Sequence, residues 1–137
     1  MVHTLSIMLI EDDTIEKMKF HRTMSSLNLG HKIIEANNGE EALEILTRND
    51  RLPDIILLDL SMPKMNGLEF LEALKSNNFW KYIPTIILTT SANHRDILTT
   101  YETGIAGYIT KPLKYEDYVE KIKRIVSYWS INELIEN

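Results

Sequence analysis

The chain has 137 residues, 44% of them hydrophobic and 26% charged, and its net charge is −5. This length and composition are typical of one globular domain, and the acidic balance without a basic block argues against direct binding to nucleic acid. With no cysteine, no segment of roughly 20 apolar residues and no secretory signal, we expect a cytoplasmic protein without disulfides or a membrane contact.

Short apolar runs alternate with segments of helical period along the whole chain. The predicted strands cover residues 5–10, 32–36, 55–59, 85–89 and 107–110. The predicted helices cover residues 14–28, the segments that follow Asn38, Asn66 and Asn93, and a last segment that starts near Tyr115. Asn38 and Asn66 each precede a Glu by three residues, which fits a capping box, and Gly104 fits a helix C′ position.

This alternation predicts one α/β domain. Strands separated by helices need crossover connections, so the sheet should be parallel. Right-handed crossovers place helices on both faces of such a sheet. The predicted domain covers residues 1–129, and residues 130–137 form a tail that extends or follows the last helix.

Polar side chains follow four of the five predicted strands. They are Glu11, Asp12 and Asp13 after the first strand, Asp59 after the third, Thr89 at the end of the fourth and Lys111 after the fifth. Ligands of open α/β sheets bind beyond the carboxyl ends of the strands, so these groups should share one pocket.

The chemistry of this pocket points to a cation and a phosphoryl group. Clustered carboxylates either have raised pKa values or share a cation, and an all-oxygen site suits Mg²⁺. Lys111 and Thr89 could then stabilise a phosphoryl group on Asp59. Each acid alone is better explained as a cap or a solvated loop residue, but their joint placement is hard to obtain by chance.

The sequence resembles the receiver domains of two-component response regulators. The matching stretches are 10–13 (Ile-Glu-Asp-Asp), 59–67 (Asp-Leu-Ser-Met-Pro-Lys-Met-Asn-Gly), 88–91 (Leu-Thr-Thr-Ser) and 107–112 (Gly-Tyr-Ile-Thr-Lys-Pro), and the match spans roughly residues 5–127. The resemblance implies a flavodoxin-like, doubly wound, five-stranded parallel sheet of order 2-1-3-4-5 with five helices.

The resemblance also implies a role for each matching residue. Asp59 would be the phosphoacceptor, and Lys111 the lysine that binds the phosphate. Glu11 and Asp12 would be the acidic pair, with Asp12 the more direct Mg²⁺ ligand, and the Ser61 backbone carbonyl would be a further metal ligand. Thr89 would be the switch hydroxyl, Tyr108 the aromatic residue that changes rotamer, and Lys111-Pro112 a cis peptide. Asp13 falls one place beyond the acidic pair. The first acid is Glu where many relatives have Asp.

A narrower resemblance points to the small stand-alone response regulators that partner bacterial phytochromes. Residues 89–93, Tyr101 and the ending 125–129 carry it. The expected function is a single-domain response regulator that takes a phosphoryl group from a sensor histidine kinase or phosphotransfer protein and signals to a downstream protein by contact. It would catalyse only its own phosphorylation and dephosphorylation.

Two other functions compete with this one. An aspartyl-nucleophile phosphatase of the haloacid-dehalogenase type usually needs a second Asp two residues after the first, where this chain has Ser61. A degenerate receiver that acts only as a binding module is opposed by the intact set of Asp12, Asp59, Thr89 and Lys111.

Aromatic and apolar residues near the end of the chain suggest an output face. Tyr101, Ile105, Tyr108, Tyr115 and Tyr118 are expected to cluster on the fourth helix, fifth strand and fifth helix, with Trp129, Ile131, Leu134 and Ile135 added by the tail. Two interpretations stay open: the tail packs on its own domain, or this face forms a homodimer.

Overall fold

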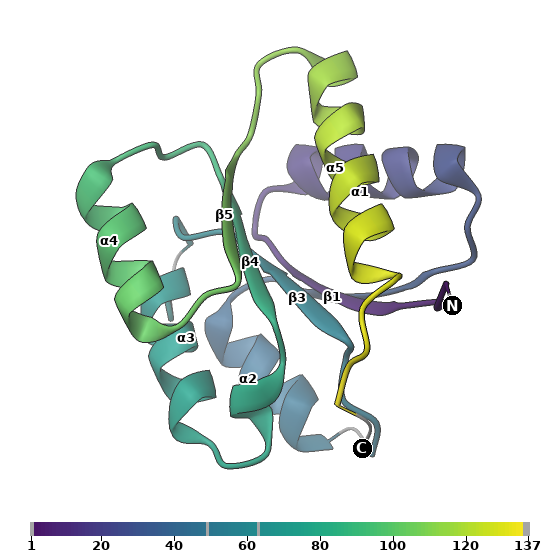
Figure 1. Cartoon of the computed structure of the whole chain (residues 1–137). Helices are drawn as coiled ribbons and strands as arrows, with labels where there is room; N and C mark the ends of the chain where they lie inside the picture. Colours follow the sequence, from purple (N-terminus) through teal and green to yellow (C-terminus); the bar gives the residue numbers. More distant parts are fainter. Residues whose placement is uncertain (1, 49, 63, 136–137) are drawn as a thin grey trace.

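The computed structural model describes residues 2–48, 50–62 and 64–135 (Figure 1). Pro63 of the 59–67 motif and residues 136–137 of the predicted tail lie outside this part. Its elements in chain order are β1 (Ser6–Ile10), α1 (Thr14–Leu27), β2 (Lys32–Ala36), α2 (Gly39–Arg48), β3 (Ile55–Leu58), α3 (Gly67–Ser76), the short 3₁₀ helix η1 (Trp80–Tyr82), β4 (Thr85–Thr89), α4 (His94–Thr103), β5 (Gly107–Thr110) and α5 (Tyr115–Trp129).

The strands form one parallel sheet of order β2-β1-β3-β4-β5, which confirms the predicted fold. β3 lies at its centre and all four of its residues are buried. Both faces of β3 are covered, so an uninterrupted apolar run suits it better than alternation. None of the helices in the described residues has both the length and the apolar composition to cross a membrane.

Alternate residues of the strands feed two separate cores. Met8 and Ile10 of β1 pack with buried residues of α2 and α3, whereas Ile7 and Leu9 pack with buried residues of α1 and α5. Figure 1 shows the same division, with α1 and α5 on one face of the sheet and α2, α3 and α4 on the other. This period of two gives the central strands two buried faces.

Asparagine caps start two helices as predicted. Asn66 and Glu69 form a complete capping box at α3, and the Asn93 side chain accepts from the backbone N–H groups of Arg95 and Asp96 at α4. At α2 only half of the expected box forms: Asn38 Oδ1 accepts from the Glu41 N–H at 2.8 Å, but the Glu41 carboxylate accepts from the Asn37 side-chain amide instead.

The C-terminal tail follows α5 and does not extend it. Beyond Trp129 the chain turns, and Leu134 packs against the core on the α1 and α5 face. The Ser130 carbonyl accepts a hydrogen bond of 2.6 Å from the His3 N–H, which ties the two ends of the chain together. Ile131 and Ile135 stay exposed.

Three members of the predicted output face, Tyr115, Tyr118 and Ile105, are turned into the protein instead. Tyr118 is buried in the core shared by α1 and α5, and the Tyr115 hydroxyl lies 3.3 Å from Thr23 Oγ1 of α1. Ile105 is buried in the opposite core. For Tyr118 the reason is the helical period of α5, which places it on the same buried face as Ile122.

Candidate functional site

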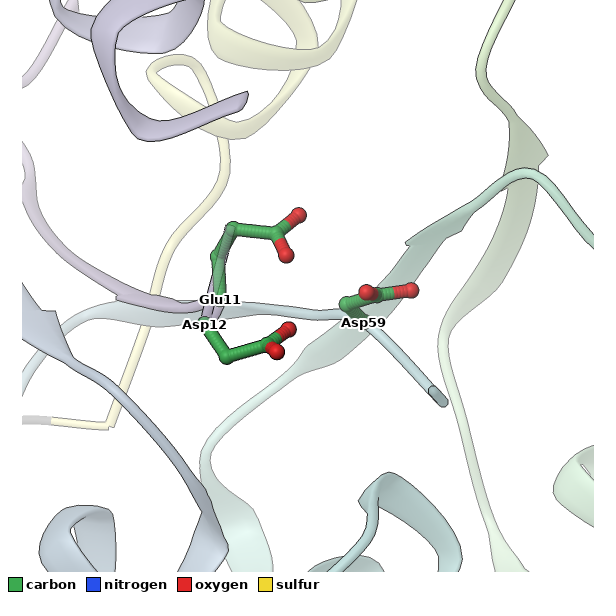
Figure 2. A group of neighbouring side chains, drawn as sticks. All are labelled: Glu11, Asp12 and Asp59. Carbon is green, nitrogen blue, oxygen red and sulfur yellow. The ribbon is translucent and has the colours of Figure 1, made fainter. Parts of the chain in front are cut away.

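Three carboxylates meet at the carboxyl edge of the sheet. Glu11, Asp12 and Asp59 each offer an oxygen, and these oxygens lie within 4.8 Å of one another (Figure 2). The parallel register that pairs Ile10 with Leu58 brings the next residues of β1 and β3 side by side, and the Asp59 N–H donates to the Ile10 carbonyl at 3.1 Å. Glu11 and Asp59 are buried whereas Asp12 is exposed, so the pocket opens to solvent past Asp12.

The ammonium group of Lys111 enters the same pocket from the end of β5. Its Nζ lies 2.5 Å from Glu11 Oε1 and 3.1 Å from Glu16 Oε1. Its backbone N–H donates to the Thr89 carbonyl at 2.7 Å, which continues the pairing of β4 with β5. Lys111 therefore faces more carboxylates than its one positive charge can neutralise, and the pocket carries net negative charge.

Burial and neighbouring charges shift the proton affinities in this pocket. Burial raises the pKa of Glu11 to about 7, although Lys111 opposes this shift, and the Asp59 carboxylate adds to it. Burial alone would lower the pKa of Lys111, but the hydrogen bond and charge of Glu11 outweigh burial and raise it. Lys111 therefore stays protonated at neutral pH.

The donor set of this pocket fits a hard divalent cation. All three groups are carboxylates, and such oxygens are the ligands that Mg²⁺ takes, usually with several retained waters. Asp12 is exposed, so solvent reaches this group of carboxylates.

A tight loop carries the chain away from Asp59. At Gly67 a Cβ atom would come 2.5 Å from the Asp59 carbonyl oxygen and 2.7 Å from Leu60 Cα, so only glycine fits against this backbone. The Gly67 N–H also donates to the Leu60 carbonyl at 3.2 Å. Ser61 is exposed in the same loop, and its role as a backbone ligand stays a prediction.

Thr89 and Tyr108 meet at the loop that follows β4. Thr89 is fully buried, and its hydroxyl accepts a long contact of 3.5 Å from the Ser91 N–H. The Tyr108 hydroxyl donates to the Ser91 carbonyl at 2.9 Å. Burial raises the pKa of Tyr108, so the hydroxyl keeps its proton at neutral pH. Ser91 Oγ in turn donates to Asp96 at 2.9 Å, and this links the loop to the first turn of α4.

The structure differs from expectation at two places beside the pocket. The Lys111–Pro112 peptide bond is trans and not cis, since the described residues contain no cis peptide. A trans bond before proline is the intrinsically favoured isomer, by about 0.5–1 kcal/mol. Asp13, beyond the acidic pair, caps α1: its Oδ1 accepts from the Glu16 N–H at 3.0 Å.

A scan against family models matches residues 7–123 to the response regulator receiver domain. The chain belongs to this family. The receiver chain is 32% identical to the response regulator Rcp1 of Synechocystis over 128 residues, which cover 90% of this chain and 87% of Rcp1.

Solved structures give the same assignment for the receiver fold. The phosphorylated cyanobacterial phytochrome response regulator RcpA superposes with a TM-score of 0.90 at 31% identity, covering 96% of this chain and 98% of RcpA. The Mn²⁺-bound form of Rcp1 superposes with a TM-score of 0.87 at 29% identity, covering 97% and 99%. The similarity therefore spans nearly the whole receiver chain and both of these regulators.

Two residues of the receiver pocket were missed by the sequence analysis. Glu16 contacts Lys111, and the Ser91 carbonyl accepts from Tyr108. Glu16 stands three residues after the capping Asp13. This spacing is typical of a helix start, so it gives no indication that the Glu16 side chain also contacts Lys111. The Ser91 contact uses a backbone oxygen, which no side-chain pattern could have revealed.

Proposed function

We propose that Asp59 accepts a phosphoryl group from a phosphohistidine of a sensor histidine kinase or phosphotransfer protein. The observation that supports this most is the grouping of Asp59 with Glu11 and Asp12 within 4.8 Å, beside the Lys111 ammonium. Within the described residues, the Asp59 side chain accepts no hydrogen bond from the protein. A carboxylate with no internal partner is available as a nucleophile.

The transfer exchanges one phosphorus bond for another. A carboxylate oxygen of Asp59 attacks the phosphorus atom, the O–P bond forms as the N–P bond of phosphohistidine breaks, and the imidazole leaves with the bonding electron pair. Lys111 is long and positively charged, so its ammonium can pair with a phosphoryl oxygen. Water later hydrolyses the acyl phosphate, so the chain acts only on its own phosphorylation state.

Mg²⁺ is the proposed cofactor. Glu11, Asp12 and Asp59 would hold it together with the backbone carbonyl of Ser61, and the carboxylate set supports this assignment. When bound, the ion offsets negative charge on the phosphoryl oxygens. The Mn²⁺-bound form of the similar Rcp1 agrees with a divalent site in this fold.

Thr89 and Tyr108 are the proposed switch. A phosphoryl group on Asp59 would draw the Thr89 hydroxyl inward, and Tyr108 would exchange its bond to the Ser91 carbonyl for the vacated space. With beryllofluoride as phosphoryl mimic, the ring resonances of Tyr108 should shift in the wild type and stay fixed in Thr89→Ala. Equal shifts in both proteins would exclude this coupling.

The phosphate donor is proposed to dock beside the pocket mouth. Ile15 and Met18 of α1 and Leu113 after β5 are large apolar residues with exposed fractions of 69%, 65% and 104%. In the sequence, Ile15 and Met18 follow the acids at positions 11–13, and Leu113 follows Lys111 by two residues. Leu113→Asp should slow phosphorylation by a kinase and leave phosphorylation by acetyl phosphate unchanged; equal slowing with both donors would rule out a docking role.

The output is proposed to pass through the face of α4, β5 and α5, to a downstream protein or a second copy of the chain. A groove on this face is lined by Ile97, Tyr101, Tyr108, Ile109 and Tyr128. The similar protein RcpA is a phytochrome response regulator, which supports a phytochrome-type sensor as the input partner of this chain. Sedimentation with and without beryllofluoride tests the homodimer, and a monomer in both states would exclude it.

Acetyl phosphate with Mg²⁺ provides the test of phosphorylation. The wild type should gain one phosphoryl group that hydroxylamine removes, and Asp59→Asn should gain none. Asp54→Asn is the matched control, because it removes an aspartate at the other end of β3 and should be labelled normally. Equal labelling of Asp59→Asn would overturn the assignment.

A further inference from the structure

The Lys111 ammonium is held by two carboxylates that come from different elements. Glu11 Oε1 at the end of β1 lies 2.5 Å away, and Glu16 Oε1 in the first turn of α1 lies 3.1 Å away. The Lys111 side chain is only 6% exposed. Because a buried ammonium needs compensating charge, both carboxylates determine where it lies.

Glu16 is itself held in place by α1. Its backbone N–H donates to Asp13 Oδ1 at 3.0 Å, and its second oxygen, Oε2, accepts from Lys19 at 3.1 Å. Burial tends to raise the pKa of Glu16, but the hydrogen bonds from Lys19 and Lys111 outweigh burial and lower it. Glu16 is therefore a fixed negative charge that divides its two oxygens between Lys19 and Lys111.

Resting on the proposed phosphorylation of Asp59, we propose that Glu16 is a positioning residue that holds Lys111 toward α1 and competes with the phosphoryl group for its ammonium. Glu11 is a candidate metal ligand, so its oxygens would also contact Mg²⁺ once the ion is bound. Glu16 is not part of that carboxylate group and keeps its hold on Lys111. Its contact stabilises the unphosphorylated arrangement relative to the phosphorylated one.

Lys19 sets the strength of this competition. It occupies Glu16 Oε2, and its own ammonium lies 4.6 Å from the centre of the Tyr118 ring. Without Lys19, both oxygens of Glu16 become available to Lys111. Changes at Glu16 and Lys19 should therefore move the phosphoryl affinity in opposite directions.

Beryllofluoride binding in the presence of Mg²⁺ tests this role without a kinase. Glu16→Gln should lower the dissociation constant of beryllofluoride by about three- to tenfold, since tenfold corresponds to one charge-assisted hydrogen bond. Glu16→Asp, which keeps the charge, should lie nearer the wild type, and Lys19→Met should raise the dissociation constant. Asp13→Asn is the matched control, because it removes a nearby charge, keeps the cap and makes no contact with Lys111.

A double-mutant cycle separates this contact from general electrostatics. In a Lys111→Met background, Glu16→Gln should leave the beryllofluoride affinity unchanged. A wild-type protein that binds beryllofluoride while Glu16→Gln has the same or weaker affinity would overturn the role of Glu16 alone, as would an effect no larger than that of Asp13→Asn. A wild-type protein that binds no beryllofluoride would overturn the proposed phosphorylation, and the role of Glu16 with it.

Discussion

The two edges of the sheet each carry aspartate, but for different purposes. At the amino edge, Asp54 Oδ2 accepts from the Ser6 N–H at 2.7 Å, and His31 Nδ1 accepts from the Leu5 N–H at 2.8 Å. At the carboxyl edge, Asp59 has no such backbone partner within the described residues and lies beside other carboxylates. A carboxylate that accepts from the backbone supports the fold, whereas one without a protein partner stays available to a cation or a phosphoryl group.

Charge separates the edges further. The carboxyl edge collects Glu11, Asp12 and Asp59 beside the buried Lys111 ammonium, so several like charges lie close together there. At the amino edge, by contrast, the tail residues Asn132 to Ile135 line a groove together with His3 and Asp54.

The largest expected effect is on metal binding at the carboxyl edge. Asp12→Ala removes a hard oxygen ligand and should weaken Mg²⁺ binding by at least about tenfold in titration calorimetry. Phosphorylation by acetyl phosphate should slow in parallel. Asp13→Asn, which changes a helix cap, serves as the control and should bind Mg²⁺ nearly as well as the wild type. Unchanged affinity in Asp12→Ala would show that Asp12 is only a surface acid.

Glycine substitutions compare the loop beside Asp59 with a loop elsewhere. Gly67→Ala should push the backbone at Asp59 and Leu60 aside, lower the free energy of unfolding by about 1–3 kcal/mol and slow phosphorylation. Gly30→Ala meets no atom within 4 Å but has a φ of +77°, so it should destabilise by about 1 kcal/mol through backbone strain. Urea unfolding and acetyl phosphate kinetics measure both, and slowed phosphorylation in Gly30→Ala would contradict the distinction.

Removing the acid at the amino edge should affect stability alone. Asp54→Ala leaves the Ser6 N–H without its partner and should lower the free energy of unfolding by about 1–2 kcal/mol. Asp54→Asn keeps an acceptor oxygen and should recover most of this loss. The two edges would not be separable if Asp54→Ala changed the phosphorylation rate as strongly as the stability.

The smallest effect is a pH dependence at the amino edge. Burial lowers the pKa of His31 below its usual 6.5. The unfolded chain then binds more protons, so the contribution of His31 is present above pH 6.5 and is lost as the pH falls through the folded pKa. Relative to His31→Asn, which accepts from the Leu5 N–H without titrating, the wild type should lose up to about 3 °C in Tm between pH 8 and pH 5. A constant difference would show that His31 does not titrate in this range.

Local sequence signals predicted the scaffold of the receiver well. The apolar run before Asp59 predicted the position of β3, and the pair Asn66 and Glu69 predicted the start of α3. The structure confirms both. These features depend on neighbours within a few residues, so periodicity and capping rules capture them. The grouping of Glu11 with Asp59 followed from parallel topology, whereas the strand order came from the resemblance to receiver domains.

Features that depend on distant contacts or on competition between partners could not be predicted. Glu16 meets Lys111 only after α1 and β5 have packed on the same sheet. Tyr115 and Tyr118 turn toward α1, because the buried face of α5 includes Tyr118. The tail beyond Trp129 carries no glycine or proline stop signal, and the core contact of Leu134 fixes its direction.

Locating the phosphoryl group is the most direct test of the account. Borohydride reduces an aspartyl phosphate to homoserine, so tandem mass spectrometry after treatment with acetyl phosphate, Mg²⁺ and borohydride identifies the reacted residue. The account predicts homoserine at position 59 and unmodified aspartate at positions 12 and 54. Homoserine at position 12 or 54, with Asp59 unmodified, would contradict it.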